Sequence, residues 1–359
     1  MTDDASVPPS AVAPSAVKSS AVVPVASDVI DPDRLRAELD DVYERFRHLD
    51  QGTVASYIPE LADADPTHFA ISVVGVGGAA FEVGDTSVPF TIQSISKPFV
   101  FGLALGDLGR DAVLDKVGVE PSGEAFNSIE FDDATRRPYN PMVNSGAIAT
   151  TGLIDGADQV ERLRRVLDTF ARYAGRELAV DSAVFFSERA TGDRNRAIAY
   201  LMRSFGMVDA DIEDTLELYF QQCSVLVDTH DLAVMGATLA NGGTNPLTGE
   251  QVLAPDYVKD VLSIMLSCGM YDYSGEWSYR VGVPAKSGVS GAILAVIPGQ
   301  AAVAVYSPPL DAKGNSVRGI AVFEELSKRY SLHYLESVFR GNTLGRAIHA
   351  ASADPEIDP

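Results

Sequence analysis

The sequence predicts an α+β fold in which one antiparallel sheet is built from both chain ends, is flanked by helices, and carries an inserted all-helical subdomain. Strand-like apolar runs follow a first helix near the N-terminus, and strand-like runs return after Gly269. Apolar residues with helical spacing fill most of the chain between these two regions. Both sets of strands must bury apolar faces, and pairing them in one sheet is the most economical way to do so.

The N-terminal elements follow from a capping residue and from glycines. A helix is predicted from Asp31, an N-cap followed by Pro32 at the first helical position, to about His48. The strand-like runs that come next cover residues 69–76, 79–83 and 88–92. Glycines after the first run, and Gly84 after the second, indicate two antiparallel hairpins.

The middle of the chain is predicted to be mostly helical. The predicted helices cover residues 96–107, 143–154, 157–173, 182–190, 193–204, 211–222, 229–240 and 255–267. The loop 119–142 is longer than most connections, and such loops are often functional. Beyond Gly269, strands are predicted over residues 277–281, 292–297 and 301–307, and helices over 316–330 and 332–339.

These elements predict one domain over residues 31–335, made of two subdomains. The α/β subdomain combines about 31–110 with about 255–335, and the helical subdomain spans about 111–254. Residues 1–30, which are rich in Ala, Val, Pro and Ser, predict a disordered N-terminal tail. Residues 336–359 are predicted to form a C-terminal tail.

The charge balance argues against several kinds of partner. The chain has 28 basic and 50 acidic residues, and the resulting net charge of −22 repels phosphate backbones and acidic lipid surfaces. We therefore expect it to bind neither nucleic acid nor a membrane. The acidic residues are scattered along the sequence, which indicates a solubilising surface rather than one acidic binding patch.

Cysteine and histidine are scarce. Cys223 and Cys268 lie within apolar helical patterns and predict buried thiols rather than a disulfide framework. The five histidines show no metal-ligand spacing, so we expect no metal site. Residues 1–30 lack the basic start and the unbroken apolar core of a signal peptide. The sequence therefore predicts a cytoplasmic protein.

The most informative motif is Ser94-Ile95-Ser96-Lys97, which lies between a strand-like run and a helical run. A lysine three residues after a serine places both side chains on one helix face. Such a pair supplies a nucleophile and an amine that takes its proton. The motif is weak by itself, because Ser94 would serve equally well as a helix N-cap.

A second motif supports the first. Lys286-Ser287-Gly288 lies just before the apolar run 292–297. A serine–lysine motif followed by Lys-Ser/Thr-Gly before a strand is the order found in serine β-lactamases and penicillin-binding proteins. We expect Ser94 and Lys286 to lie near the seam between the two subdomains, where pockets tend to form.

Further polar clusters occur in the order and spacing of a known family. They are the segments 57–60, 139–147, 187–195, 219–224 and 268–272, beside 93–97 and 286–291. Over about residues 35–330 the chain resembles the serine-dependent glutaminase family, which shares the β-lactamase-like fold. The resemblance implies a glutaminase domain that hydrolyses the side-chain amide of L-glutamine to L-glutamate and ammonia without a cofactor. It also implies a homo-dimer or homo-tetramer.

The resemblance implies roles for individual residues. Ser94 would be the nucleophile, Lys97 its general base, and Tyr271 the residue that relays a proton to the leaving ammonia. The main-chain N–H groups of Ser94 and Val289 would form the oxyanion hole. A lysine acts as a base only when it is neutral, and burial and a nearby like charge both lower its pKa. Our hypothesis is that Lys286 supplies part of that like charge.

The resemblance also assigns the substrate-binding residues. Glu188 would bind the α-ammonium group of the substrate. The residues that would bind its carboxylate and position its side chain are Asn144, Asn195, Tyr57 and Tyr219. Ser94, Tyr271 and Val289 are also expected to contact the substrate. Neutral donors hold a carboxylate without adding another cation beside Lys97. Taken singly, Tyr271 would more simply be a partly buried aromatic near a turn, and the others surface or cap residues.

Two alternative functions remain open from the sequence. A β-lactamase or D-Ala-D-Ala peptidase would share the fold, but its substrates lie outside the cytoplasm and need no amino-acid-recognition residues. A glutamine sensor without catalytic activity would keep the pocket, but it would not need Ser94, Lys97 and Tyr271 together.

Overall fold

The computed structural model describes residues 32–124 and 128–338. The tail predicted over residues 1–30 lies outside the described residues. Of the tail predicted over 336–359, the first three residues belong to the short helix α13 (Tyr334–Val338), and the rest lies outside the described residues.

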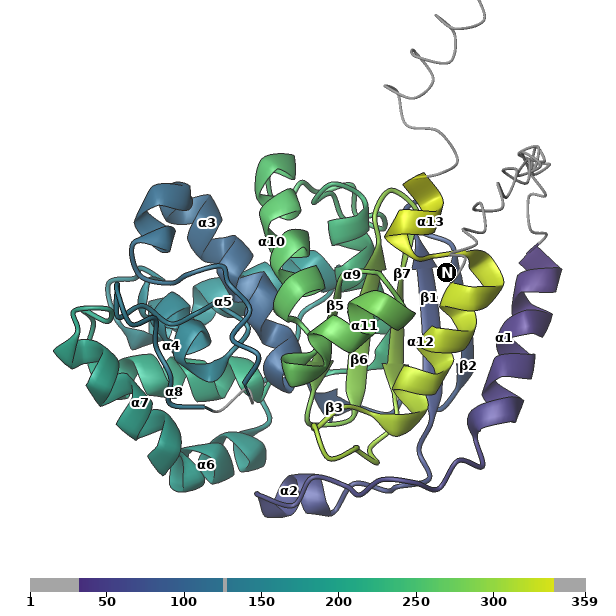
Figure 1. The fold of residues 1–359 in the computed structure, drawn as a ribbon, viewed down its shortest axis with the longest axis horizontal. Helices are drawn as coiled ribbons and strands as arrows, with labels where there is room; N and C mark the ends of the chain where they lie inside the picture. The colour runs from purple at the N-terminus through teal and green to yellow at the C-terminus, as the bar shows by residue number, and fades with distance from the viewer. Residues whose placement is uncertain (1–31, 125–127, 339–359) are drawn as a thin grey trace, which may run out of the picture.

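A five-stranded antiparallel sheet joins segments from both ends of the chain (Figure 1). Its strands, in spatial order, are β2 (Ala80–Gly84), β1 (Ala70–Gly75), β7 (Ala301–Tyr306), β6 (Ala292–Ile297) and β5 (Ala285–Gly288). β1 pairs with β7 in a register that sets Ala70 opposite Tyr306. The predicted α+β fold, with a sheet built from both chain ends, is confirmed.

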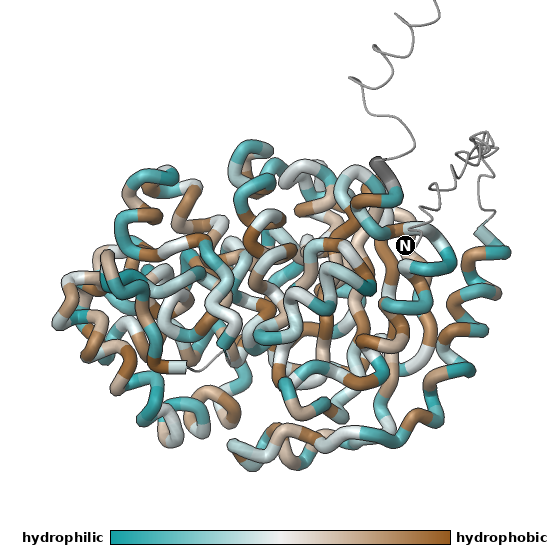
Figure 2. Tube along the Cα trace, viewed as in Figure 1, coloured by the Kyte–Doolittle hydropathy of each residue, from teal (hydrophilic) through white to brown (hydrophobic). Residues whose placement is uncertain are grey.

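Each face of the sheet packs against its own helices, because successive residues of a strand point to opposite faces. Val303 and Val305 of β7 share a core with α1 (Pro32–Phe46), α11 (Ser274–Arg280) and α12 (Val317–Tyr330). Ala302 and Ala304 face the other way, toward α9 (Thr229–Ala240). Figure 2 shows the strands mostly brown between helices whose outer turns are teal, as expected for a sheet covered on both faces.

The central helix α9 is buried almost throughout, which explains its nearly continuous apolar sequence. A capping box starts it, in which the side chains of Asp228 and Asp231 each accept a hydrogen bond from the other's backbone N–H. α9 packs against β1, β6 and β7, although its residues fall in the range predicted for the helical subdomain. The division into subdomains stays a prediction.

The other long helices lie beyond α9 and form the left and centre of Figure 1. They are α3 (Ser96–Leu114), α4 (Asn144–Gly152), α5 (Gln159–Ala174), α6 (Ser182–Thr191), α7 (Asp193–Ser204), α8 (Ile212–Cys223) and α10 (Pro255–Cys268). Asp158, Asp181 and Asp211 cap α5, α6 and α8 with their side chains. All the helices predicted in this region are present, and α3 continues past its predicted end through a non-helical Gly109.

The strand predicted over residues 277–281 is wrong, because this segment forms α11. Its sequence alternates apolar and polar residues, which favoured a strand. In the structure Trp277 and Val281 are buried, whereas Tyr279 between them is 84% exposed. Buried residues four positions apart are the spacing of a helix face. The strand β5, which carries Lys286, was not among the predicted strands.

The hairpin predicted at Gly84 is also wrong. The chain turns away after Asp85, where Val88 N donates to Asp85 O, and leaves the five-stranded sheet. The third predicted strand becomes β3 (Phe90–Thr91), which pairs instead with β4 (Leu226–Val227) in a separate two-stranded sheet. This pairing fixes the chain immediately before Ser94 against the chain that follows α8.

Within residues 32–124 and 128–338, no helix combines the length and the apolar character needed to cross a lipid bilayer.

The close contact between α9 and the sheet predicts a steric effect on stability. A Cβ atom at Gly236 would lie 2.6 Å from both Ala302 Cβ and Leu294 Cδ1. We expect Gly236→Val to lower the free energy of unfolding by about 2 kcal/mol or more, because overpacking forces these neighbours apart. The matched control is Gly77→Val in the β1–β2 turn, where nothing lies within 4 Å of the added Cβ. Equal denaturation midpoints for the two variants would contradict the prediction.

Candidate active site

Ser94 lies in a tight turn between β3 and α3. The turn is the short 3-10 helix η1 (Gln93–Ile95), and it begins with Gln93 in a left-handed conformation at φ 49°. That conformation is uncommon for a residue other than glycine, and such strain is concentrated at functional sites. Ser94 itself is buried. The N-caps of η1 and α3 are Ile92 and Ile95, so Ser94 is not a helix cap.

Lys97 lies on the first turn of α3 and is buried. Its Nζ donates to Asn144 Oδ1 at 2.7 Å and to the Met142 carbonyl oxygen at 3.1 Å. Burial lowers the pKa of Lys97 to about 8, because desolvation disfavours the ammonium form. A substantial fraction of this amine is therefore neutral at the pH of most cells, as a proton acceptor requires.

Lys286 lies on β5, and its charge interacts with that of Lys97. Burial first, and the charge of Lys97 second, hold the pKa of Lys286 well below its usual value. Burial is the main cause of the low pKa of Lys97, and the hypothesis that Lys286 supplies part of a depressing charge stays a prediction. Lys286 Nζ donates to Ser287 O at 2.7 Å and lies 4.1 Å from the centroid of the Tyr271 ring.

Tyr271 connects Ser94 to the end of β5. It opens the 3-10 helix η2 (Tyr271–Tyr273) with a left-handed backbone at φ 57°. Its hydroxyl donates to Ser287 O at 2.9 Å and is hydrogen-bonded to the Ser94 side chain. Burial raises the pKa of Tyr271 well above that of a free phenol, so its hydroxyl keeps its proton. The contact with Ser94 places a protonated phenol beside the candidate nucleophile.

The segment that carries Val289 lies against the Ser94 turn. A Cβ atom at Gly288 would approach Ile92 O to 3.2 Å and Ile95 Cγ1 to 3.3 Å, so glycine permits the close approach of β5 to η1. The neighbouring Val289 packs against a small cluster formed by Ile58, Leu61 and Val184. The backbone of Val289 is therefore held between η1 and the helices α2 (Pro59–Ala62) and α6.

A second polar group surrounds Glu188 on α6. Its buried carboxylate accepts a hydrogen bond from Tyr57 Oη at 2.6 Å and another from Gln93. Burial raises the pKa of Glu188, and the two hydrogen bonds partly oppose this effect. The Tyr57 side chain is amphipathic here: the residue is 49% exposed, but its hydroxyl points inward to Glu188. Tyr57 therefore lies at the surface end of the site.

Asn144 links the base to a third group of predicted residues. While its Oδ1 accepts from Lys97, its Nδ2 donates to Asn195 Oδ1 on α7 at 3.0 Å. Tyr219 of α8 is buried nearby, and burial first, with the nearby charge of Glu188 as a smaller cause, raises its pKa. The structure thus brings all the predicted site residues into one region, although they come from eight separate segments of the chain.

Two further residues belong to this region. Gln93, which was part of the motif but had no role assigned, bonds to Glu188 and so connects the Ser94 turn to α6. Cys223 was predicted only as a core thiol, and its thiol is hydrogen-bonded to Ser96 and Tyr219. Burial raises the pKa of Cys223 to about 12, so the thiol is neutral. The only sequence signal for either residue is its position inside one of the polar clusters, 93–97 for Gln93 and 219–224 for Cys223.

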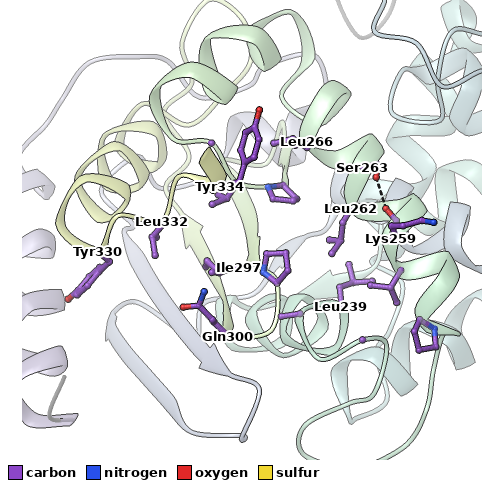
Figure 3. A pocket seen from close by; sticks show the side chains of 18 of the residues that line it. Leu239, Lys259, Leu262, Ser263, Leu266, Ile297, Gln300, Tyr330, Leu332 and Tyr334 are labelled. Carbon is purple, nitrogen blue, oxygen red and sulfur yellow. Dashed lines mark hydrogen bonds between the residues drawn. The ribbon is translucent and has the colours of Figure 1, made fainter. Parts of the chain in front are cut away.

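Two cavities differ in their relation to the site. A cavity of about 450 Å³ borders Tyr271, Met142 and Val143 and adjoins the residues described above. Another, of about 770 Å³, is lined mainly by apolar side chains of α9, α10 and the segment 330–334, such as Leu239, Leu262 and Leu332 (Figure 3). It contains none of the predicted site residues. Among the described residues, no three His, Cys, Asp or Glu side chains gather as metal ligands.

Known proteins resemble this chain in both sequence and structure. Residues 52–335 match the family model described as Glutaminase. A protein named Glutaminase from Trichormus variabilis is 59% identical over 309 residues, which cover 86% of this chain and 92% of the relative. Another, from Clavibacter michiganensis subsp. michiganensis, is 48% identical and covers 79% of this chain and 86% of its own length.

Solved structures show the same likeness. One described as probable glutaminase ybaS has a TM-score of 0.80 and 42% identity, and the match covers 84% of this chain and 98% of that chain. A crystal structure of Mglu in its glutamate form has a TM-score of 0.82 and 42% identity, covering 87% of this chain and 72% of that chain.

The lowered pKa of Lys97 predicts how the reactivity of Ser94 depends on pH. If Lys97 takes the Ser94 proton, the rate of labelling by phenylmethylsulfonyl fluoride rises about tenfold per pH unit below the pKa of Lys97 and levels off above it. The pKa of Lys97 places the levelling-off of the labelling rate at about pH 8. Mass spectrometry of the labelled Ser94 peptide measures the rate. Lys97→Met is the control and should remove the pH dependence; a wild-type rate independent of pH would contradict the prediction.

Proposed function

The chain belongs to the glutaminase family, which makes it an enzyme that hydrolyses L-glutamine to L-glutamate and ammonia, and we propose that it does so through an ester on Ser94. The observation that carries this mechanism is the environment of Ser94. A protonated Tyr271 is hydrogen-bonded to it, and Lys97, three residues further along the chain on the first turn of α3, is a buried amine with a lowered pKa. A nucleophile, a base and an acid are thereby close together.

In the first half-reaction, neutral Lys97 takes the proton from Ser94 Oγ as this oxygen attacks the side-chain carbonyl carbon of glutamine. The N–H groups of Ser94 and Val289 stabilise the negative oxygen of the tetrahedral intermediate. When the C–N bond breaks, Tyr271 gives its proton to the leaving ammonia and recovers one from the Lys97 ammonium. The product on the enzyme is a γ-glutamyl ester of Ser94.

In the second half-reaction, water attacks this ester and the same groups act in reverse. The water proton passes to the Lys97/Tyr271 pair, and Ser94 Oγ leaves with a proton returned by it. L-Glutamate departs, and the base is again neutral. No step requires a metal or an organic cofactor.

The substrate pocket extends from Ser94 toward α6 and α7. Glu188 binds the α-ammonium group, which donates to the carboxylate in place of some of the hydrogen bonds that Tyr57 and Gln93 donate in this structure. Asn144, Asn195 and Tyr219 supply neutral donors for the α-carboxylate and the side chain. The solved structure of Mglu in its glutamate form, at 42% identity, supports a pocket that holds a free amino acid.

The compartment and the assembly also belong to the proposal. Both cysteines are free thiols, which fits the cytoplasm. A homo-dimer or homo-tetramer is proposed from the family resemblance. The proposed domain organisation keeps one glutaminase domain, with Ser94 and Lys286 on the side of the α/β subdomain that faces the helical subdomain.

The covalent mechanism predicts loss of activity when the nucleophile is removed. We expect Ser94→Ala to lower kcat for ammonia release from L-glutamine by about 10³-fold or more, because the ester can no longer form. Lys97→Arg should have a similar effect, since a guanidinium stays charged and accepts no proton. Near-native turnover by either variant would contradict the mechanism, and cleavage of a chromogenic cephalosporin in place of glutamine would favour the β-lactamase alternative.

The assignment of Glu188 predicts an effect on substrate binding. Glu188→Gln removes the negative charge but retains the shape of the side chain. We expect KM for L-glutamine to rise about 10- to 100-fold, because a hydrogen bond to a charged group is lost. Steady-state kinetics at several glutamine concentrations measures KM. An unchanged KM would show that the ammonium binds elsewhere.

A further inference from the structure

A second carboxylate lies beside the proposed ammonium site. Glu60 is on the short helix α2, which docks on α6 through Ile58, Leu61 and Val184. Glu60 Oε1 accepts a hydrogen bond from Ser187 Oγ at 2.8 Å. Ser187 immediately precedes Glu188 on α6, so this bond anchors the Glu60 carboxylate on the same turn of that helix.

The other oxygen of this carboxylate makes no interaction in the described part of the chain that stabilises the fold. Glu60 Oε2 is buried and has no hydrogen-bond partner among the described residues. A buried carboxylate oxygen without a partner is costly, and an apolar side chain would dock α2 without that cost. The position therefore favours a role for the charge itself.

The charge of Glu60 reaches Glu188. Its repulsion is one of the causes that raise the pKa of Glu188, after the larger effect of burial. The other groups that face Glu188 are neutral: the hydroxyls of Tyr57 and Tyr219, the amide of Gln93 and the thiol of Cys223. Two nearby carboxylates repel each other, and a cation bound between or beside them relieves that repulsion.

We propose that Glu60 is a second anionic group of the substrate pocket, which attracts the α-ammonium group through space and favours free α-amino acids over α-N-blocked ones. This inference rests on the proposed role of Glu188. Glu60 acts at longer range than Glu188, since its Oε1 is held by Ser187. It determines specificity by strengthening the negative potential around the ammonium and takes no part in the proton transfers at Ser94.

The test is Glu60→Gln, whose Oε1 can still accept the hydrogen bond from Ser187. We expect KM for L-glutamine to rise about three- to tenfold while kcat changes less than about twofold, because the lost attraction acts on the bound ammonium. Removing a like charge also lowers the pKa of Glu188. In a plot of kcat/KM against pH, the fall on the acid side should therefore move to lower pH. A variant that only weakened the docking of α2 on α6 would not move it.

Two further variants serve as controls. Glu44→Gln removes the same formal charge from α1, where the side chain is 59% exposed and pairs with Arg47, and it should change neither KM nor the pH profile. Glu60→Asp keeps a negative charge near the site, so its KM should lie closer to wild type than that of Glu60→Gln. A rise in KM as large for Asp as for Gln would overturn the role of the charge.

The outcomes separate this inference from the proposed function. If Glu188→Gln raises KM but Glu60→Gln leaves both KM and the acid side of the profile unchanged, only the role of Glu60 is overturned. If Glu188→Gln has no effect on KM, the ammonium site itself is misassigned and the role of Glu60 is overturned with it.

Discussion

The burial of the Lys97 amine is the constraint on which the proposed chemistry of this chain depends. Its hydrogen bonds go to two neutral oxygens, Asn144 Oδ1 and Met142 O, which orient the amine without fixing a positive charge on it. A carboxylate in either place would favour the ammonium form and raise the pKa. The same requirement explains why the residues proposed to bind the substrate carboxylate are amides and phenols, and why the acidic groups lie at Glu188 and Glu60.

The fold meets this constraint by enclosing the site between two parts of the chain. α3 supplies Lys97, α4 and the loop just before it supply its two acceptors, and β5 and η2 supply Lys286 and Tyr271. β5 approaches η1 closely because Gly288 has no side chain to prevent it. Gln93 and Tyr271, at the two ends of the Ser94–Tyr271 contact, both have a left-handed backbone. This conformation is unfavourable for residues other than glycine, so the packing of the surrounding chain has to stabilise it at both positions.

Sequence reasoning was strongest where a pattern is local. The helices over 193–204 and 229–240 have the predicted bounds, because local signals define them: Gly192 precedes the first, and a capping box starts the second. The segment 277–281 was predicted as a strand because three alternating apolar residues fit that pattern. The structure shows a helix, in which Tyr279, the middle one of the three, is exposed. β3 could not be paired correctly, since its partner β4 is two residues long and distant in sequence. Ordered motifs indicated the site residues, but not the Lys97–Asn144 and Gln93–Glu188 hydrogen bonds, which depend on how helices pack.

The pairing of β1 with β7 has a consequence for biosynthesis. Ribosomes make β1, β2 and the Ser94 turn early, and β5, η2 and β7 only near the end of the described chain. A nascent chain therefore carries Ser94, the proposed nucleophile, before it has Tyr271, Lys286 or Val289, and its first hairpin lacks the strand β7 that pairs with β1. Such non-local pairing is expected to make folding slow and its intermediates prone to aggregate. Activity can arise only after translation has delivered the final strands.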